Sequence, residues 1–248
     1  MIKRKLEQIK TTTFHKLNQM LGKADYGKFV VVTRSRTGST LLITLLNSHK
    51  EIIAYGEKFR RLGDKSCQDI YEEVFPKKSR KYIGFKIFFY HPLDSEDRSV
   101  WEMLEKDKSI KIIHLRRENQ LRVHISRLIA GKTEKWLNSG GEKTSIGERK
   151  VEIDMKELYQ DFEITNSSIA EAKQRFKDHK SMDLSYEELV ADKEQALKRV
   201  LDFLGLDEMK LESQLKRQNP EKIRDLVTNY DELVQALTGT EHAFMLEE

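Results

Sequence analysis

Short apolar runs alternate along this chain with stretches of helical periodicity. The runs at residues 29–33, 83–89 and 110–115 are rich in β-branched and aromatic residues and lack the regular polar alternation of a half-exposed strand. Continuous apolar strands are typical of parallel sheets that are buried on both faces. Helical segments between them favour βαβ units. The sequence therefore predicts an α/β protein with three α/β/α layers around a central parallel sheet.

The remaining elements follow from the same periodicities. A short strand is predicted at residues 182–185, and helices are predicted at residues 39–48, 100–106, 118–130, 153–177 and 193–204. Residues 131–150 are rich in glycine and charge, and we predict a mobile loop there. Pro220 stands where a C-terminal helix would begin, and that helix would end before Gly239.

The length of 248 residues suits one large domain with a small appendage. Residues 1–28 carry a thin apolar stripe among lysines and predict an amphipathic helix or arm. This arm would pack loosely on the body, or dock on a membrane surface or a partner. Residues 29–248 would then form a single domain.

Composition excludes several protein classes. Every apolar run is shorter than the roughly 18 residues of a membrane span, and the basic N-terminus is not followed by the apolar core of a signal peptide. The single cysteine, Cys67, fits a free thiol in a reducing compartment, so we expect a cytoplasmic protein. A net charge of +4 suits a small anionic ligand, and we expect no nucleic acid partner. The oligomeric state cannot be inferred.

The segment between the first strand and the first helix predicts an anion site. Backbone N–H groups and a helix N-terminus form a concavity that favours anions in such a turn. Gly38 allows close approach of the backbone, and Ser39 and Thr40 can cap the helix and donate hydroxyls. Arg34 and Arg36 add positive charge. A bound phosphate or sulfate fits these features.

This loop is not a Walker A motif, which requires a second glycine and a lysine that the segment lacks. The absence of that lysine disfavours a kinase or a nucleotide triphosphatase. We therefore expect no metal-bound triphosphate and no metal site.

The loop resembles the 5′-phosphosulfate loop of sulfotransferases that use 3′-phosphoadenosine 5′-phosphosulfate (PAPS), particularly the bacterial and carbohydrate-type branch. Arg36 stands where the steroid and phenol branch has a lysine. The resemblance implies a P-loop-NTPase-like sulfotransferase fold, PAPS as the sulfuryl donor and no metal. It assigns cofactor binding to seven loop residues: Arg34, Ser35, Arg36, Thr37, Gly38, Ser39 and Thr40.

A second segment resembles the part of the same family that holds the 3′-phosphate. It lies where residues 110–115 lead into the next predicted helix, and strand ends of this kind are common anion sites. The resemblance assigns Arg117 and Ser126 to the 3′-phosphate. Their spacing is one residue longer than in the cytosolic branch, which leaves Arg116 as a competitor for Arg117.

Two weaker segments follow in the family's order. Residues 184–189, followed by residues 203–206, resemble an element that places Tyr186 near the adenine. Lys216 and Arg217 match in position the basic loop that covers the 3′-phosphate.

The catalytic base is assigned by the same resemblance. Related bacterial sulfotransferases use a glutamate after the first helix, at the position of Glu57, whereas the cytosolic branch uses a histidine, for which His91 is the alternative. Arg36 would stabilise the charge that develops on the leaving phosphate. Lys86 lies within an apolar strand, which is an unusual place for a charge, and is a further candidate for the site.

The resemblance implies in-line transfer of a sulfuryl group from PAPS to a hydroxyl or amine, with release of adenosine 3′,5′-bisphosphate (PAP). Residues 57–75, 91–98 and 131–150 would line the acceptor pocket, and their polarity favours a saccharide, a glycolipid or a polar metabolite over a steroid. O- and N-sulfation both stay open. The alternatives are a P-loop-type kinase or nucleotide-binding protein, and a non-catalytic nucleotide-binding relative.

Overall fold

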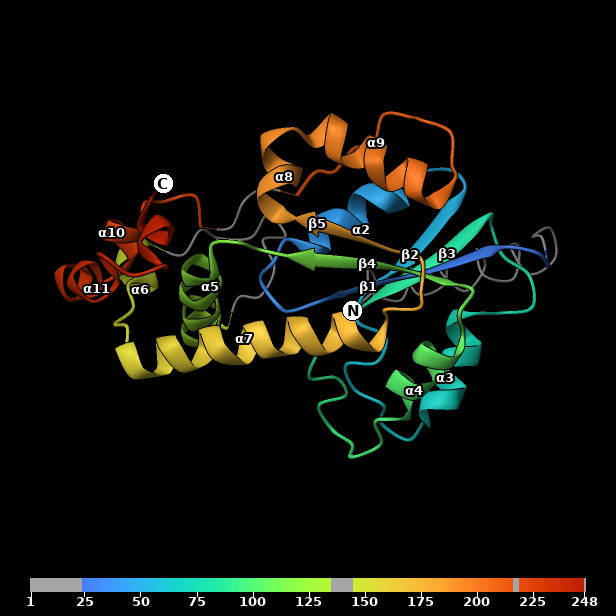
Figure 1. Cartoon of the computed structure of the whole chain (residues 1–248), viewed down its shortest axis with the longest axis horizontal. Coiled ribbons are helices and arrows are strands. Elements are labelled where there is room, and N and C mark those ends of the chain that lie inside the picture. The colour runs from blue at the N-terminus through green and yellow to red at the C-terminus, as the bar shows by residue number, and fades with distance from the viewer. Residues whose placement is uncertain (1–23, 135–144, 216–218, 248) are drawn as a thin grey trace.

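The computed structural model describes residues 24–134, 145–215 and 219–247. Its sheet has five strands, all parallel, in the order β2-β3-β1-β4-β5 (Figure 1). The strands are β1 Gly27–Thr33, β2 Ile52–Tyr55, β3 Tyr82–Phe88, β4 Ile110–Arg116 and β5 Ser181–Ser185. Because β1 lies between β3 and β4 and all strands are parallel, the segments that follow these three strands lie side by side at the carboxyl ends of the strands.

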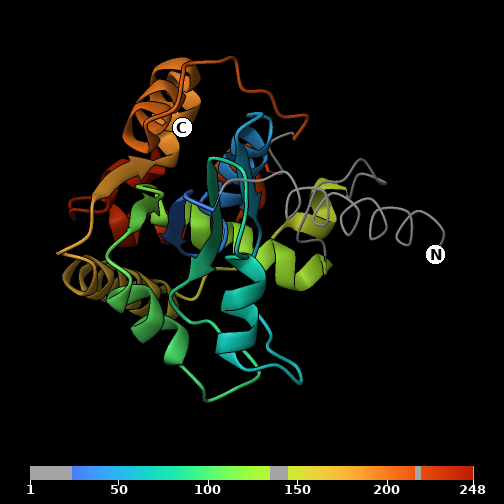
Figure 2. The ribbon, with the colours of Figure 1, turned by 90° about the vertical axis from the view of Figure 1, so that its right-hand side faces the viewer.

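Helices cover both faces of the sheet, which gives the three layers seen in Figures 1 and 2. One face is covered by α2 Ser39–Asn47, α8 Tyr186–Ala191 and α9 Lys193–Leu204. The other face is covered by α3 Cys67–Val74, α4 Ser99–Lys106 and α7 Met155–Arg175. Beyond the end of β4 lie α5 Gln120–Thr133, α6 Ile146–Arg149, α10 Ile223–Leu226, α11 Tyr230–Leu237 and the 3₁₀ helix η1 Ala243–Leu246.

Strand β1 shows why the apolar runs are continuous. Phe29 and Val31 belong to the core under α2 and α9, whereas Val30 and Val32 belong to the core over α3 and α4. All four side chains are fully buried. Successive side chains of a strand point to opposite faces, so a strand between two helical layers must be apolar at every position.

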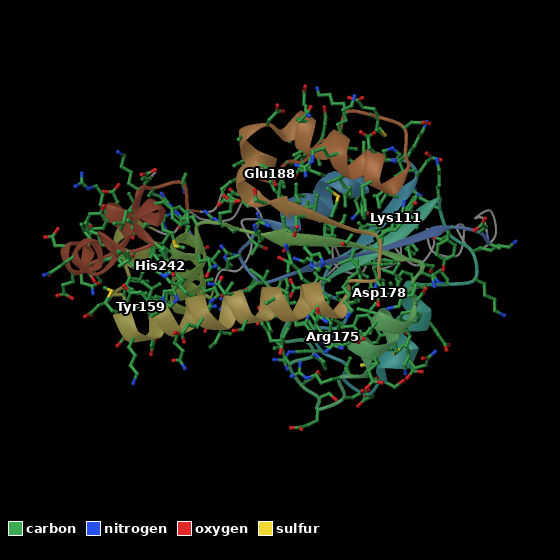
Figure 3. All side chains as sticks on the ribbon, viewed as in Figure 1. Lys111, Tyr159, Arg175, Asp178, Glu188 and His242 are labelled. Carbon is green, nitrogen blue, oxygen red and sulfur yellow. The ribbon has the colours of Figure 1, made fainter. Side chains whose placement is uncertain are left out.

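A third core joins the elements beyond β4. It contains apolar side chains of α5, the first half of α7, α10, α11 and η1. Helix α7 has 21 residues: Tyr159 lies beside His242 near one end, while Arg175 and Asp178 lie at the other end (Figure 3). This long helix therefore connects the third core with the sheet.

The predicted three-layer parallel fold is confirmed. Each predicted strand matches an observed strand, and the first and last residues agree to within two positions. Strand β2 and helix α3 were not predicted. The helix expected from Pro220 is instead two helices, α10 and α11, and neither begins at Pro220. Of the predicted loop at 131–150, α5 takes the first residues and α6 the last, and residues 135–144 lie outside the described residues.

The predicted N-terminal arm also lies largely outside the description. Residues 1–23 are not described, and β1 already begins at Gly27. The division into an arm and a single domain stays a prediction. Among the described residues, no helix combines the length and apolar character needed to cross a membrane.

Candidate functional site

Helix α2 begins without a side-chain cap, directly after the loop that follows β1. Gly38 is the N-cap residue, in a left-handed conformation with φ 82°, and the first turn contains no acidic residue. By contrast, Ser66 and Ser185 form complete capping boxes on α3 and α8. The expected cap by Ser39 or Thr40 was therefore wrong. The first-turn N–H groups and the helix dipole favour an anion at this end of α2.

The backbone conformation of Gly38 and its contact with Tyr186 both require glycine. A Cβ built on Gly38 would lie 2.4 Å from Cδ2 of Tyr186. Left-handed strain alone costs about 1–2 kcal/mol for a residue with a Cβ. We expect Gly38→Ala to lower the free energy of unfolding by more than this, because the new Cβ also meets Tyr186. Gly63→Ala is the matched control, because Gly63 has φ 60° and no heavy atom within 4 Å of its built Cβ. Denaturant unfolding measures both variants, and equal losses would contradict the packing argument.

The base of the loop is held by hydroxyl groups. Thr37 donates to the carbonyl of Arg34 at 2.9 Å, and its Oγ1 lies 2.7 Å from Oγ1 of Thr33. Thr33 in turn bonds to the carbonyl of Leu115, at 2.7 Å, which ties the loop to β4. The Thr37 hydroxyl is thus used within the fold.

Arg34 points away from the anion site, into the protein. Its guanidinium forms an ion pair with Asp161 and donates to Thr165, both on α7. Only 9% of Arg34 is exposed. Its predicted cofactor contact is not favoured by this geometry, in which Arg34 anchors the loop.

Arg36 and Ser126 lie together, although 90 residues separate them in the sequence. Nε of Arg36 donates to Oγ of Ser126 at 2.8 Å, and Arg117 donates to the carbonyl of Arg36 at 3.4 Å. The first two predicted phosphate segments thus meet in space. Nδ2 of Asn219 also lies 3.2 Å from the Ser126 hydroxyl. Lys216 and Arg217 lie outside the described residues. Asn219 was not predicted as a site residue, and its only signal in the sequence is its place just after them.

Arg117, and not Arg116, faces the loop. Arg116 is bound near the surface by Glu118 and Asp183, at 3.4 and 3.7 Å. The guanidinium carbon of Arg117 lies 4.5 Å from the ring centre of Tyr186, whose other neighbour is Gly38. The structure therefore favours Arg117 for the role that the sequence left open between the two arginines.

Glu187 connects two of the predicted segments. Its carboxylate accepts hydrogen bonds from the backbone N–H groups of Glu118 and Asn119, at 3.0 and 3.3 Å, and lies 3.9 Å from Nε of Arg117. In the sequence, Glu187 belongs to the segment 184–189 and was given no role of its own. Nothing local in the sequence shows that it reaches across to the segment after β4.

Lys86 joins the loop to Glu57. From the middle of β3, its buried Nζ lies 2.9 Å from Oγ1 of Thr40, 3.4 Å from Oγ of Ser39 and 3.1 Å from Oε1 of Glu57. Burial lowers the pKa of Lys86, and the carboxylate of Glu57 opposes this shift. The candidate base is therefore held beside the first turn of α2, as the unusual position of Lys86 suggested.

His91 is buried against Glu57 in its neutral form. Its Nδ1 accepts the N–H of Phe88 at 3.3 Å, so the ring proton belongs on Nε2, which lies 3.9 Å from Oε2 of Glu57. Burial lowers the pKa of His91 to about 4, with further lowering by Arg60, Lys86 and Arg98. A neutral ring with a protonated Nε2 cannot accept a proton there, which favours Glu57 as the base.

The depressed pKa of His91 predicts a pH dependence of stability. The unfolded chain binds a proton near pH 6.5 and the folded protein only near pH 4, so stability falls as pH drops between these values. We expect His91 to account for a loss on the order of 2–3 kcal/mol. His91→Asn retains an acceptor for the Phe88 N–H. In this variant, the free energy of unfolding measured from pH 4 to 7 should depend less on pH than in the wild type. An unchanged dependence on pH would contradict the assignment to His91.

Tyr90 completes the site and was not predicted. Its hydroxyl is hydrogen-bonded to Ser35, and burial together with the nearby Glu57 raises its pKa. Its position directly before His91 is the only signal in the sequence. Among the residues that the structure describes, no group of three or more His, Cys, Asp or Glu side chains could hold a metal ion.

This chain is similar to known proteins in sequence and in fold. A model of the sulfotransferase family matches residues 108–210. The chain is 25% identical over 235 residues to Nodulation protein H of Rhizobium tropici, with 88% of this chain and 92% of the relative covered. It is 26% identical to Nodulation protein H of Rhizobium meliloti (strain 1021), covering 83% and 89%. A crystal structure of a sulfotransferase from Alicyclobacillus acidocaldarius shares the fold, with a TM-score of 0.50, 15% identity and coverage of 79% and 87%.

Proposed function

We propose that this chain, whose residues 108–210 match a model of the sulfotransferase family, is a sulfotransferase. It would transfer a sulfuryl group from PAPS to a hydroxyl or amine of a saccharide, a glycolipid or a polar metabolite. The observation that carries this proposal is the placement of Glu57. Through Lys86, its carboxylate is held next to Ser39 and Thr40 at the uncapped start of α2. A candidate base thus adjoins an anion site.

The residues present fit the two charged ends of PAPS. At the 5′ end, the first-turn N–H groups of α2, the hydroxyls of Ser39 and Thr40, and Lys86 would hold the phosphosulfate. At the 3′ end, Ser126 and Arg117 would hold the phosphate, with Arg36 between the two ends. Tyr186, packed on Gly38 and Arg117, would contact the adenine. PAPS supplies a sulfuryl group on a phosphate that leaves readily.

The reaction proceeds in line without a covalent enzyme intermediate. The acceptor oxygen or nitrogen forms a bond to sulfur while the bond from sulfur to the bridging phosphate oxygen breaks, and that oxygen keeps the electron pair. Glu57 takes the proton from the acceptor. Lys86 and Arg36 offset the negative charge that develops on the leaving phosphate. His91, buried and neutral with Nε2 3.9 Å from Oε2 of Glu57, would adjoin the base without taking the proton.

The acceptor would approach past Tyr90 and Arg60. The Tyr90 hydroxyl contacts Ser35, and Nε of Arg60, with a side chain that is half exposed, lies 3.9 Å from Oε2 of Glu57. Polar and cationic side chains at this entrance support a polar acceptor over an apolar one.

A transfer assay tests this proposal. The full chain is incubated with PAPS and a panel of saccharides, glycolipids, amines and phenols, and PAP release is compared with the mass gain of one SO₃ on the acceptor. We expect equal amounts of both products, without added metal, from a polar acceptor. Transfer to phenols alone would contradict the acceptor class, and PAP binding without transfer to any acceptor would support a non-catalytic relative.

A further inference from the structure

One buried carboxylate, Asp161 on α7, contacts both halves of the candidate site. On the loop side it forms the ion pair with Arg34. On the α5 side, Oδ2 lies 3.1 Å from Nδ1 of His124, and Oδ1 accepts a hydrogen bond from Arg127 at 2.9 Å. The carboxylate is therefore bound by side chains from two elements far apart in the sequence.

The partners of Asp161 flank the residues that would bind the nucleotide. Arg34 lies two residues before Arg36 in the loop, and His124 and Arg127 lie on either side of Ser126 in α5. The side chain of Asp161 is 10% exposed and that of His124 is 4% exposed. Charged groups that are buried in this way are held in one geometry, because any other would leave a charge without a partner.

We propose that Asp161 is a positioning residue that sets the distance between the loop and Ser126, and thereby between the sites for the 5′ and 3′ phosphates. This inference rests on the proposed function. Asp161 touches neither phosphate site itself: it acts through Arg34 on one side and through His124 and Arg127 on the other.

A ratio of affinities separates positioning from mere stabilisation. Adenosine 5′-monophosphate engages only the loop half, whereas PAP engages both halves. The ratio of the two dissociation constants therefore reports how well Ser126 and Arg117 are placed relative to the loop. Loss of stability without displacement would lower the melting temperature and leave this ratio unchanged.

The experiment measures both ligands by calorimetric titration, below the melting temperature of each variant. We expect Asp161→Asn to reduce the advantage of PAP over adenosine 5′-monophosphate by about tenfold. Asp183→Asn is the matched control, because Asp183 is a half-exposed carboxylate paired with Arg116 and Lys173 outside the site, and its ratio should equal that of the wild type.

A second pair of variants applies if Asp161→Asn does not fold. His124→Leu removes the donor to Asp161 and should lower the ratio, whereas His124→Asn supplies a side-chain N–H and should restore it. An unchanged ratio in a variant that binds PAP overturns the inference alone. Absence of PAP binding by the wild type overturns the proposed function, and the inference with it.

Discussion

Replacing Arg36 by alanine is expected to lower the affinity for PAP by about 100-fold and to abolish sulfuryl transfer. Arg36 bonds from the loop to Ser126, and its guanidinium is partly desolvated, which lowers its pKa. Charge-assisted hydrogen bonds in such surroundings contribute about 1.5–3 kcal/mol each, and Arg36 is placed to serve both ends of the donor. Titration with PAP and a turnover assay with PAPS measure the two effects.

The backbone of Arg36 requires a control. Its φ is 69°, so alanine at this position keeps the strain that arginine already has. Arg36→Gly removes the same side chain and relieves the strain, and should lose PAP affinity equally. Arg36→Lys keeps the charge without the Nε donor and should lie between the wild type and alanine. Unchanged turnover in Arg36→Ala would contradict the site assignment.

Glu57→Gln is expected to reduce turnover by about 10²- to 10⁴-fold, which is the usual contribution of a general base. The amide has the shape of the carboxylate but cannot take the acceptor proton. PAP affinity should stay close to that of the wild type, because the carboxylate of Glu57 is joined to the loop through Lys86. Single-turnover rates with PAPS and titration with PAP separate the two steps.

His91→Asn is the comparison for Glu57→Gln. We expect it to keep most of the turnover, because Nδ1 of His91 is engaged by Phe88 and the ring is neutral above about pH 4. If Glu57→Gln stays active while His91→Asn does not, the assignment of the base is wrong.

The fold was predicted where burial leaves a direct mark on the sequence. Residues 29–32 are apolar at every position, and residues 110–115 at all but Lys111 and His114, because each strand contacts both helical layers. Strand β2 has only four residues, Ile52–Tyr55, at the edge of the sheet. A run of that length carries no period, so only its pairing with β3 shows that it is a strand.

The site was predicted in part for a related reason. A strand, a glycine-containing turn and a helix form the loop locally, and resemblance linked it to Arg117 and Ser126, which the structure places beside Arg36. The contacts of Asp161 and Glu187 depend on how distant elements pack. No local pattern encodes such contacts, so only the assembled structure shows them.

Thermal melting of the wild type with added nucleotide tests the central claim most directly. PAP is compared with ADP and with ATP, each with and without Mg²⁺, because a ligand at about 100 times its dissociation constant stabilises the folded protein by roughly 2.7 kcal/mol. We predict a rise in melting temperature with PAP that does not depend on Mg²⁺, and little or none with ADP or ATP. A rise only with ATP and Mg²⁺ would contradict the account and indicate a kinase.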